Sequence, residues 1–206
     1  MGQLKKYFSL DVEASGPVPG MYSMISLGMC VVGNPDQQFY VELRPLNRRF
    51  TLEAMKIGCL ELECLSDLKA RVPSYDARSK KFNPQKVLRH LEKVGESPAV
   101  AMTRLNNWIF LVTLPCKAVV AAAPASFDVA FQNYYFARFF HGQNPFGHSS
   151  EDINSMYRGL RRNVESHIEG MDFADGRRYP HHALDDAIHQ AKHFQIVLQE
   201  MGYENP

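Results

Sequence analysis

Hydrophobic and polar residues alternate at the start of the chain, which is typical of a β-strand. Within residues 7–14 the two alternating sets are Phe8, Leu10, Val12, Ala14 and Tyr7, Ser9, Asp11, Glu13. Successive side chains of a strand point to opposite faces, so each set shares one face. A Gly/Pro-rich loop follows at 15–20. Apolar runs at Met24–Val32 and Phe39–Leu43, with a turn signal at 33–36, predict an antiparallel meander.

Later in the chain, apolar residues recur at helical spacing. The clearest stripe follows Ser97-Pro98, a pair typical of a helix start. Besides that helix, which reaches about 112, we predict helices at about 52–57, 85–94, 127–140 and 182–201, and one capped by Ser149 and Ser150 that runs to about 162. Lys117–Ala123 is typical of a buried strand, and 163–179 of a loop. The pattern indicates an α/β fold.

Composition places the chain among ordinary globular proteins. It has 206 residues, 45% hydrophobic and 22% charged, with a formal net charge of +1. These values exclude disordered and coiled-coil classes and predict a single domain over 1–206. We find no apolar run of bilayer-spanning length and no signal-peptide core near the N-terminus, so we expect no membrane partner. The four cysteines form no CxxC pair, which favours free thiols in a reducing cytoplasm over a zinc site.

Charge is uneven along the chain although the total is near zero. The segment at about 67–96 carries eight basic and four acidic residues, a net charge of +4. We interpret it as a basic surface segment, a loop followed by a short helix. It is either a track for a nucleic-acid strand or only a solvated face.

Two carboxylates lie on one face of the first predicted strand. Asp11 and Glu13 are two residues apart, so they point to the same side. Like charges at this distance repel each other unless a cation lies between them, and oxygen ligands suit Mg²⁺ or Mn²⁺. A solvated strand face is the alternative. The pair ends a buried-type strand just before a Gly/Pro loop, where α/β sheets tend to place their sites.

Two further acidic positions begin predicted helices. Asp128 follows the Lys117–Ala123 strand, and Asp185 and Asp186 open the last helix after His181-His182. Asp185 and Asp186 differ by about 100° around the helix axis, so we expect only one to face a site. Helix-dipole or capping roles are the alternative for these aspartates.

Together these segments resemble the motifs of the DEDDh 3′–5′ exonucleases. The first motif is matched by Phe8–Gly16 and Ile25–Gly28, the second by Ser126–Phe131, and the third by His181–Ala187. The segments 51–58 and 152–157 also resemble the family, so the similarity covers nearly the whole chain in the expected order. Each motif by itself is short, and the three in succession carry the resemblance.

This resemblance implies an RNase H-like fold with a central mixed sheet, an antiparallel meander plus parallel strands, flanked by helices. It implies two divalent ions, Mg²⁺ or Mn²⁺, held by Asp11, Glu13, Asp128 and Asp186, with His181 as the general base for the attacking water. The implied activity is hydrolysis of single-stranded DNA or RNA from the 3′ end, releasing nucleoside 5′-monophosphates. A homodimer is a further expectation from the family. The alternatives are a catalytically weak nucleic-acid-binding module and a hydrolase of small oligonucleotides.

The resemblance also implies where the terminal nucleotide binds. The matching positions are Ala14, Ser15 and Gly16, with Met24 and Ile25 near the base; for the last two a core role is the alternative. One departure concerns residues 123–125, where many relatives carry His-Asn-Ala and this chain has Ala-Pro-Ala. That change removes no implied ligand, but it leaves substrate choice open. Two bound divalent ions would give a positive total charge, so the near-neutral sequence does not exclude a nucleic-acid partner.

Overall fold

A five-stranded mixed sheet forms the centre of the protein. The computed structural model describes residues 4–171 and 181–203. The strands are β1 (Lys5–Ala14), β2 (Met24–Val31), β3 (Asn34–Glu42), β4 (Lys117–Ala122) and β5 (Ser150–Asp152). Their order across the sheet is β3-β2-β1-β4-β5. The β1–β2 and β2–β3 pairs are antiparallel, and the β1–β4 and β4–β5 pairs are parallel. This confirms the predicted meander and the mixed sheet.

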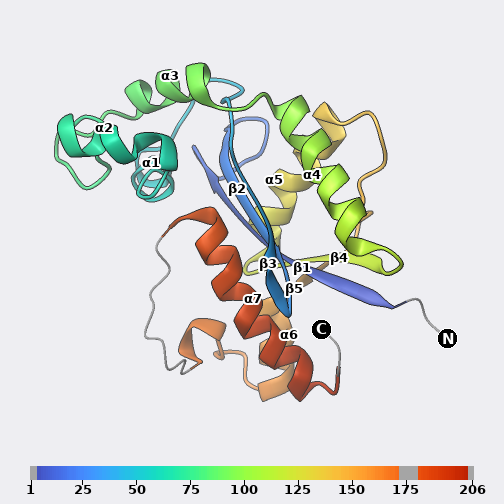
Figure 1. Cartoon of the computed structure of the whole chain (residues 1–206). Helices are drawn as coiled ribbons and strands as arrows, with labels where there is room; N and C mark the ends of the chain where they lie inside the picture. The colour runs from blue at the N-terminus through green and yellow to red at the C-terminus, as the bar shows by residue number, and fades with distance from the viewer. Residues whose placement is uncertain (1–3, 172–180, 204–206) are drawn as a thin grey trace.

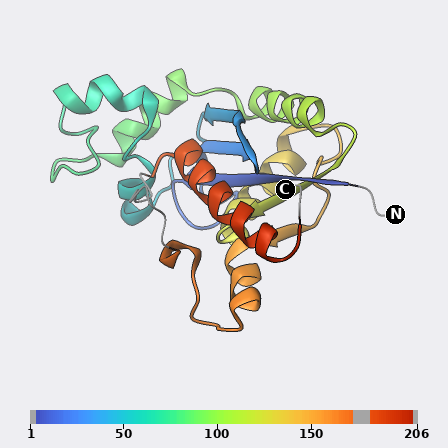
Figure 2. The same ribbon diagram turned by 60° about the horizontal axis from the view of Figure 1, so that its bottom comes forward.

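Helices cover both faces of this sheet, so the molecule has three layers (Figure 1). On one face lie α4 (Pro98–Thr113) and α5 (Ala125–Phe139); on the other lie α6 (Ile153–Arg161) and α7 (Ala183–Glu200). Figure 2 shows α7 running across the strands. The alternating residues of β1 explain this sandwich, because Phe8 and Leu10 pack in the α4/α5 core while Tyr7 packs in the α7 core.

A helical lobe follows β3 and carries a small core of its own. It contains α1 (Leu52–Gly58), a 3₁₀ turn (Glu63–Leu65), α2 (Ser66–Arg71) and α3 (Pro84–Val94). Buried Met55, Leu65, Val87, Leu88 and Leu91 are part of its hydrophobic cluster. The lobe includes most of the basic 67–96 segment and projects beside the sheet edge formed by β3 (Figure 1).

Several predicted boundaries were wrong. The turn after β2 is formed by Val32 and Gly33, so β3 begins at Asn34, inside the predicted turn. Ser150 belongs to the short strand β5, and Asp152 caps α6 by accepting the Ser155 N–H at 2.8 Å. The 67–96 segment contains all of the additional helix α2 except its first residue, and the predicted 163–179 loop contains a 3₁₀ turn at Ile168–Gly170. The end of that loop, from 172, lies outside the described residues. Within the described part, none of the helices has the length and apolar character needed to cross a membrane.

Candidate active site

The row of side chains that faces α7 on β1 contains Asp11 and Glu13. Their direct neighbours on β2 are Gly28 and Ser26. Glu13 is 9% exposed, and α7 packs over this face. Glu13 is therefore withdrawn from solvent and Asp11 is half-buried, and both point to the same side of the sheet. This excludes a solvated strand face for Glu13.

The first turn of α5 brings a third carboxylate to the same place. Asp128 is 3% exposed, and its Oδ1 accepts the backbone N–H of Val12 at 2.9 Å. That bond ties the start of α5 to β1, between the two acidic residues of the strand. Asp128 thus makes a long-range contact with β1, which a role in the helix dipole alone does not require.

The start of α7 supplies a fourth carboxylate and a histidine. Asp186 is buried and Asp185 is exposed, as the 100° offset between them predicts. Candidate ligand atoms of Glu13, His181 and Asp186 all lie within 4.8 Å of one another. His181 adopts a left-handed backbone conformation with φ of 58°. The structure therefore brings together the ends of β1, α5 and α7.

Burial and mutual repulsion make this cluster unfavourable when all four carboxylates are charged. Burial raises the pKa of Asp11 and of Glu13 well above the ordinary range, and neighbouring carboxylates raise both further. Burial also raises the pKa of Asp128 and that of Asp186 to about 7 each, partly offset by backbone hydrogen bonds from Val12 and His181 respectively. A positive charge within the cluster would stabilise the ionised forms.

The donor set fits a divalent cation. Carboxylate oxygens are the ligands that Mg²⁺ and Mn²⁺ prefer. Asp186 Oδ1 is buried and accepts no hydrogen bond from the described residues, and a buried oxygen without a partner is costly unless something unseen compensates it. Asp11, Glu13, Asp128 and Asp186 could hold such an ion.

Gln190 belongs to the same cluster, although the sequence analysis did not single it out. It lies one helical turn after Asp186 and is 2% exposed. Its Nε2 donates to Asp11 Oδ1 at 3.0 Å, and its Oε1 accepts the Ala123 N–H at 2.9 Å. The i+4 spacing from Asp186 on the buried face of α7 was the only signal in the sequence.

At residues 123–125 the sequence differs from the motif that it otherwise resembles. Side chains of this chain bond two backbone N–H groups of that segment. The Ala123 N–H is taken by Gln190, and the Ala125 N–H donates to Asp152 Oδ2 at 2.9 Å. Asp152 also caps α6. These two bonds fix the turn between β4 and α5, which places Asp128.

A cavity of about 400 Å³ adjoins the cluster at Glu13. Glu13, Ala14 and Gly16 line one side, and Thr51, Ile57 and Phe127 are among the residues lining the rest. Its size suits a small organic ligand. Two of the three predicted loop contacts, Ala14 and Gly16, therefore border an open space.

Ser15, Met24 and Ile25 are placed differently from the expectation. All three have 0% exposure. Ser15 Oγ donates to the Arg49 carbonyl and accepts the Ser23 N–H, both at 2.9 Å. Met24 and Ile25 belong to two hydrophobic clusters. Met24 and Ile25 are therefore core residues, which was the alternative that the sequence left open. Phe127 and Ile57, which line the cavity, were not identified by the sequence analysis.

Comparisons with known proteins identify relatives of this chain. Residues 73–198 match the model of the 3′–5′ exoribonuclease Rv2179c-like domain. The chain is 33% identical to the 3′–5′ DNA exonuclease Cap18 of Escherichia coli over 93% of this chain and 90% of that protein.

Solved structures show the same fold. The nuclease domain of 3′hExo, a DEDDh family member bound to rAMP, superposes with a TM-score of 0.64 at 14% identity, covering 96% of this chain and 94% of that one. Exonuclease I of E. coli in complex with a dT13 oligonucleotide has a TM-score of 0.59 at 14% identity, covering 96% and 42%. The fold is thus that of these nucleases, and the family-model match with the 33% identical relative leads to one conclusion: the chain belongs to the family of 3′–5′ exonucleases that the Rv2179c-like domain defines.

Proposed function

We propose that this protein hydrolyses single-stranded nucleic acid from the 3′ end with two divalent cations, Mg²⁺ or Mn²⁺, and releases nucleoside 5′-monophosphates. The observation that carries the proposal is a cluster of three buried carboxylates, Glu13, Asp128 and Asp186, with the half-buried Asp11 and with His181, beside a cavity of about 400 Å³. Phosphodiester hydrolysis needs a deprotonated water and a stabilised leaving oxygen, and this set of groups suits both requirements.

Asp11, Glu13, Asp128 and Asp186 would hold the cations. Bound there, the cations supply the positive charge that favours ionised water and offsets charge on the leaving 3′ oxygen. The protein fixes the orientation of two of these carboxylates. The Val12 N–H donates to Asp128 Oδ1 and Gln190 Nε2 donates to Asp11 Oδ1, so the second oxygen of each aspartate is left for an ion.

His181 would act as the general base. A neutral imidazole can accept a proton from water, and a ligand atom of His181 lies within 4.8 Å of those of Glu13 and Asp186. In the proposed reaction the oxygen of water forms a bond to phosphorus while its proton passes to the His181 ring. The bond from phosphorus to the 3′ oxygen of the preceding nucleotide breaks, and that oxygen takes up a proton from solvent, to which His181 releases the proton that it accepted.

The terminal nucleotide would occupy the cavity beside Glu13. Ala14 and Gly16 line the side nearest β1, and Phe127 offers an aromatic ring for base stacking. Stacking on an aromatic ring tolerates every base, because each base has a π face. An enzyme that shortens strands stepwise needs this tolerance.

The decisive experiment follows a 5′-labelled single strand with Mg²⁺ or Mn²⁺, with DNA and RNA in parallel. We expect a ladder that shortens from the 3′ end, and its loss in EDTA or in Asp186→Asn. Asp36→Asn, a matched change at an exposed position on β3, should retain the activity. The parallel arms are needed because the matched family model is of exoribonuclease type and the curated relative is a DNA exonuclease.

Each alternative has its own signature in this assay. A strand that binds but stays intact with every metal would favour a nucleic-acid-binding module. Cleavage confined to dinucleotides and other short oligonucleotides would favour a small-oligonucleotide hydrolase.

The free thiols of the four cysteines support a reducing compartment such as the cytoplasm. A homodimer stays a prediction.

A further inference from the structure

Three residues lie in one row across the sheet: Asp11 on β1, Gly28 on β2 and Tyr40 on β3. Directly paired residues of neighbouring strands point to the same face, so Asp11 and Tyr40 share the face that α7 covers. Gly28 between them has no side chain. The backbone of Ala183 and Leu184 fills that space, at 2.2–2.3 Å from where a Cβ of Gly28 would lie. The first turn of α7 therefore lies directly on the sheet.

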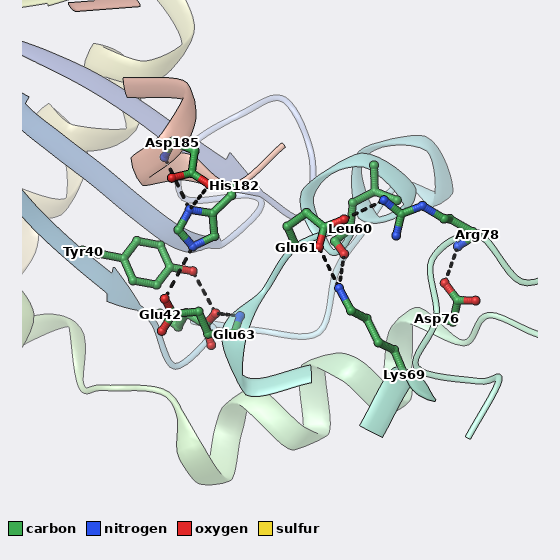
Figure 3. A network of polar contacts seen from close by, with 10 residues as sticks. All are labelled: Tyr40, Glu42, Leu60, Glu61, Glu63, Lys69, Asp76, Arg78, His182 and Asp185. Atoms are coloured by element: carbon green, nitrogen blue, oxygen red, sulfur yellow. Dashed lines mark hydrogen bonds and ion pairs between the residues drawn. The ribbon is translucent and has the colours of Figure 1, made fainter. Parts of the chain in front are cut away.

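His182 precedes that first turn and packs against Tyr40. The two rings are 4.5 Å apart between centroids with an angle of 30° between their planes. His182 Nδ1 accepts the Asp185 N–H at 3.4 Å, so the ring also caps α7. Its Nε2 lies 3.7 Å from Glu63 Oε1, and its side chain is 12% exposed. Figure 3 shows the ring enclosed by Tyr40, Glu63 and Asp185.

Glu42 holds the other side of this enclosure. It lies two residues after Tyr40 on the same face of β3, and its Oε1 accepts the Tyr40 hydroxyl at 2.8 Å. It also accepts the backbone N–H groups of Glu63 and Cys64, the latter at 3.1 Å. One carboxylate thus joins the tyrosine to the 3₁₀ turn of the lobe (Figure 3). The ring of His182 is clamped between the sheet edge and the lobe.

His181 is the residue that this clamp would position. It is bonded directly to His182 and has a φ of 58°, a region that costs an ordinary side chain roughly 1 kcal/mol or more. Such a conformation persists only where the surroundings enforce it. On the C-terminal side of His181, three described contacts hold the backbone in this conformation. They are the ring contact between Tyr40 and His182, the capping of α7 by His182, and the close packing of α7 on Gly28.

We propose that Tyr40, Glu42 and Glu63 form a positioning clamp on His182 that holds the neighbouring His181 in place for proton transfer. The inference rests on the proposed role of His181 as general base. Neither these three residues nor His182 touches the reacting atoms in this scheme. They act through the backbone at 181–182, and they couple the helical lobe to the catalytic end of α7.

The test is a double-mutant cycle between Tyr40 and His181. Tyr40→Leu removes the ring stack, and we expect kcat to fall roughly tenfold or more with KM for the strand within about twofold, because a small misplacement of a catalytic group is costly. Tyr40→Phe keeps the ring and should restore kcat to within about twofold of the wild-type value. In a His181→Ala background, Tyr40→Leu should cost less than about twofold, because the group it positions is absent.

Tyr75→Leu is the matched control, because Tyr75 forms another tyrosine–histidine ring contact in the lobe, with His90 at 5.9 Å, and does not belong to the clamp. It should leave kcat unchanged. An equal loss from Tyr40→Leu in the wild-type and His181→Ala backgrounds would overturn the proposal, since it would show a general structural defect. So would a loss of the same size from Tyr75→Leu.

A measurement without substrate separates this proposal from the proposed function. Tyr40→Leu should speed hydrogen exchange at the Asp185 and Asp186 amides, which bond to His182 in the first turn of α7, and Tyr75→Leu should not. Unchanged exchange in Tyr40→Leu would refute the clamp even in an active enzyme. Faster exchange in a protein that cleaves no strand would support the clamp on α7, and only the proposed function would have failed.

Discussion

Gly28 lies directly opposite Asp11 on the neighbouring strand, and the backbone of α7 occupies the space beside it. This pairing explains how Asp186 and Gln190 reach the carboxylates of β1. A helix that packs on a sheet is normally held away from the strand backbones by the side chains between them. At Gly28 the separating side chain is absent, so the first turn of α7 descends to the sheet.

Gly28→Ala should therefore disturb the site through α7. The added methyl would meet backbone atoms at 2.2–2.3 Å, and we expect a loss of about 1–3 kcal/mol in the free energy of unfolding, as for other overpacked cores. Nuclease activity should fall as well, because Asp186 and His181 move with the helix. Urea denaturation and a strand-cleavage assay measure the two effects.

Gly159→Ala on α6 is the control for that change, because nothing lies within 4 Å of the corresponding methyl. It should leave activity intact and stability equal or slightly higher, since alanine favours helix more than glycine does. An active, fully stable Gly28→Ala protein would contradict the role assigned to the close approach of α7.

Gln190→Leu should weaken metal binding more than it weakens the fold. The amide orients Asp11 through Nε2 and is itself oriented by the Ala123 N–H. Residues that orient metal ligands typically contribute 10–100-fold to affinity, so we expect the Mg²⁺ or Mn²⁺ midpoint to rise by about that factor. Titration of the metal against thermal stability measures it without substrate.

Gln199→Leu, an exposed glutamine on the same helix, provides the comparison for Gln190→Leu. The two variants should differ in metal midpoint. Equal midpoints would show that Gln190 does not orient a ligand.

Stability without metal should decrease as pH rises. Asp128 and Asp186 have folded pKa values of about 7 against 3.8 for the ordinary group, so between these values the folded state binds more protons than the unfolded state. The stabilisation is present below the unfolded pKa and is lost as pH rises through about 7. In EDTA we expect a Tm several degrees lower at about pH 8 than at about pH 5.5, since each kcal/mol shifts Tm by about 2–4 °C.

Saturating Mg²⁺ should reduce this pH dependence, because the cations offset the carboxylate charges. Asp186→Asn should also reduce it in EDTA, since one ionising member of the cluster is gone. A Tm in EDTA that rises over the same pH interval would count against the buried, mutually repelling cluster.

The basic lobe gives a prediction about strand length. Lys69 and Arg78 pair with Glu61, but Lys80, Lys81 and Lys86 are exposed, and no ion pair is seen for them within the described part of the chain. Changing these three lysines to Glu should weaken binding of long strands, lower its salt dependence and spare dinucleotides, because each phosphate contact releases counterions. Fluorescence anisotropy at two salt concentrations measures this effect.

The same charge reversal at Lys117 and Arg138, which lie on β4 and α5 outside the lobe, is the control and should have less effect on long strands. If the lobe variant lost binding of long strands and of dinucleotides equally, that result would contradict a strand track at residues 67–96. The segment would then be only a solvated face.

Much of the site follows from local sequence patterns. Alternation along residues 7–14 is enough to put Asp11 and Glu13 on one side of a strand, because side chains of a strand have a period of two. Helical geometry is enough to predict that only one of Asp185 and Asp186 faces inward. The order of the three motifs was enough to indicate the family, which the comparisons confirm.

Tertiary structure decided what depends on neighbours far apart in the chain. Asp11 accepts a hydrogen bond from Gln190, 179 positions away in the sequence. The register of β1 and β2 places Gly28 beside Asp11, so α7 approaches the sheet next to that carboxylate. The polar segment Ser150–Asp152 shows no alternation of apolar residues, so only its pairing with β4 reveals a strand. Met24 and Ile25 are apolar under either interpretation, and packing alone showed them to be core. The residue types and their local faces are a property of the sequence, whereas their partners depend on sheet register and helix packing, which form only when distant segments meet.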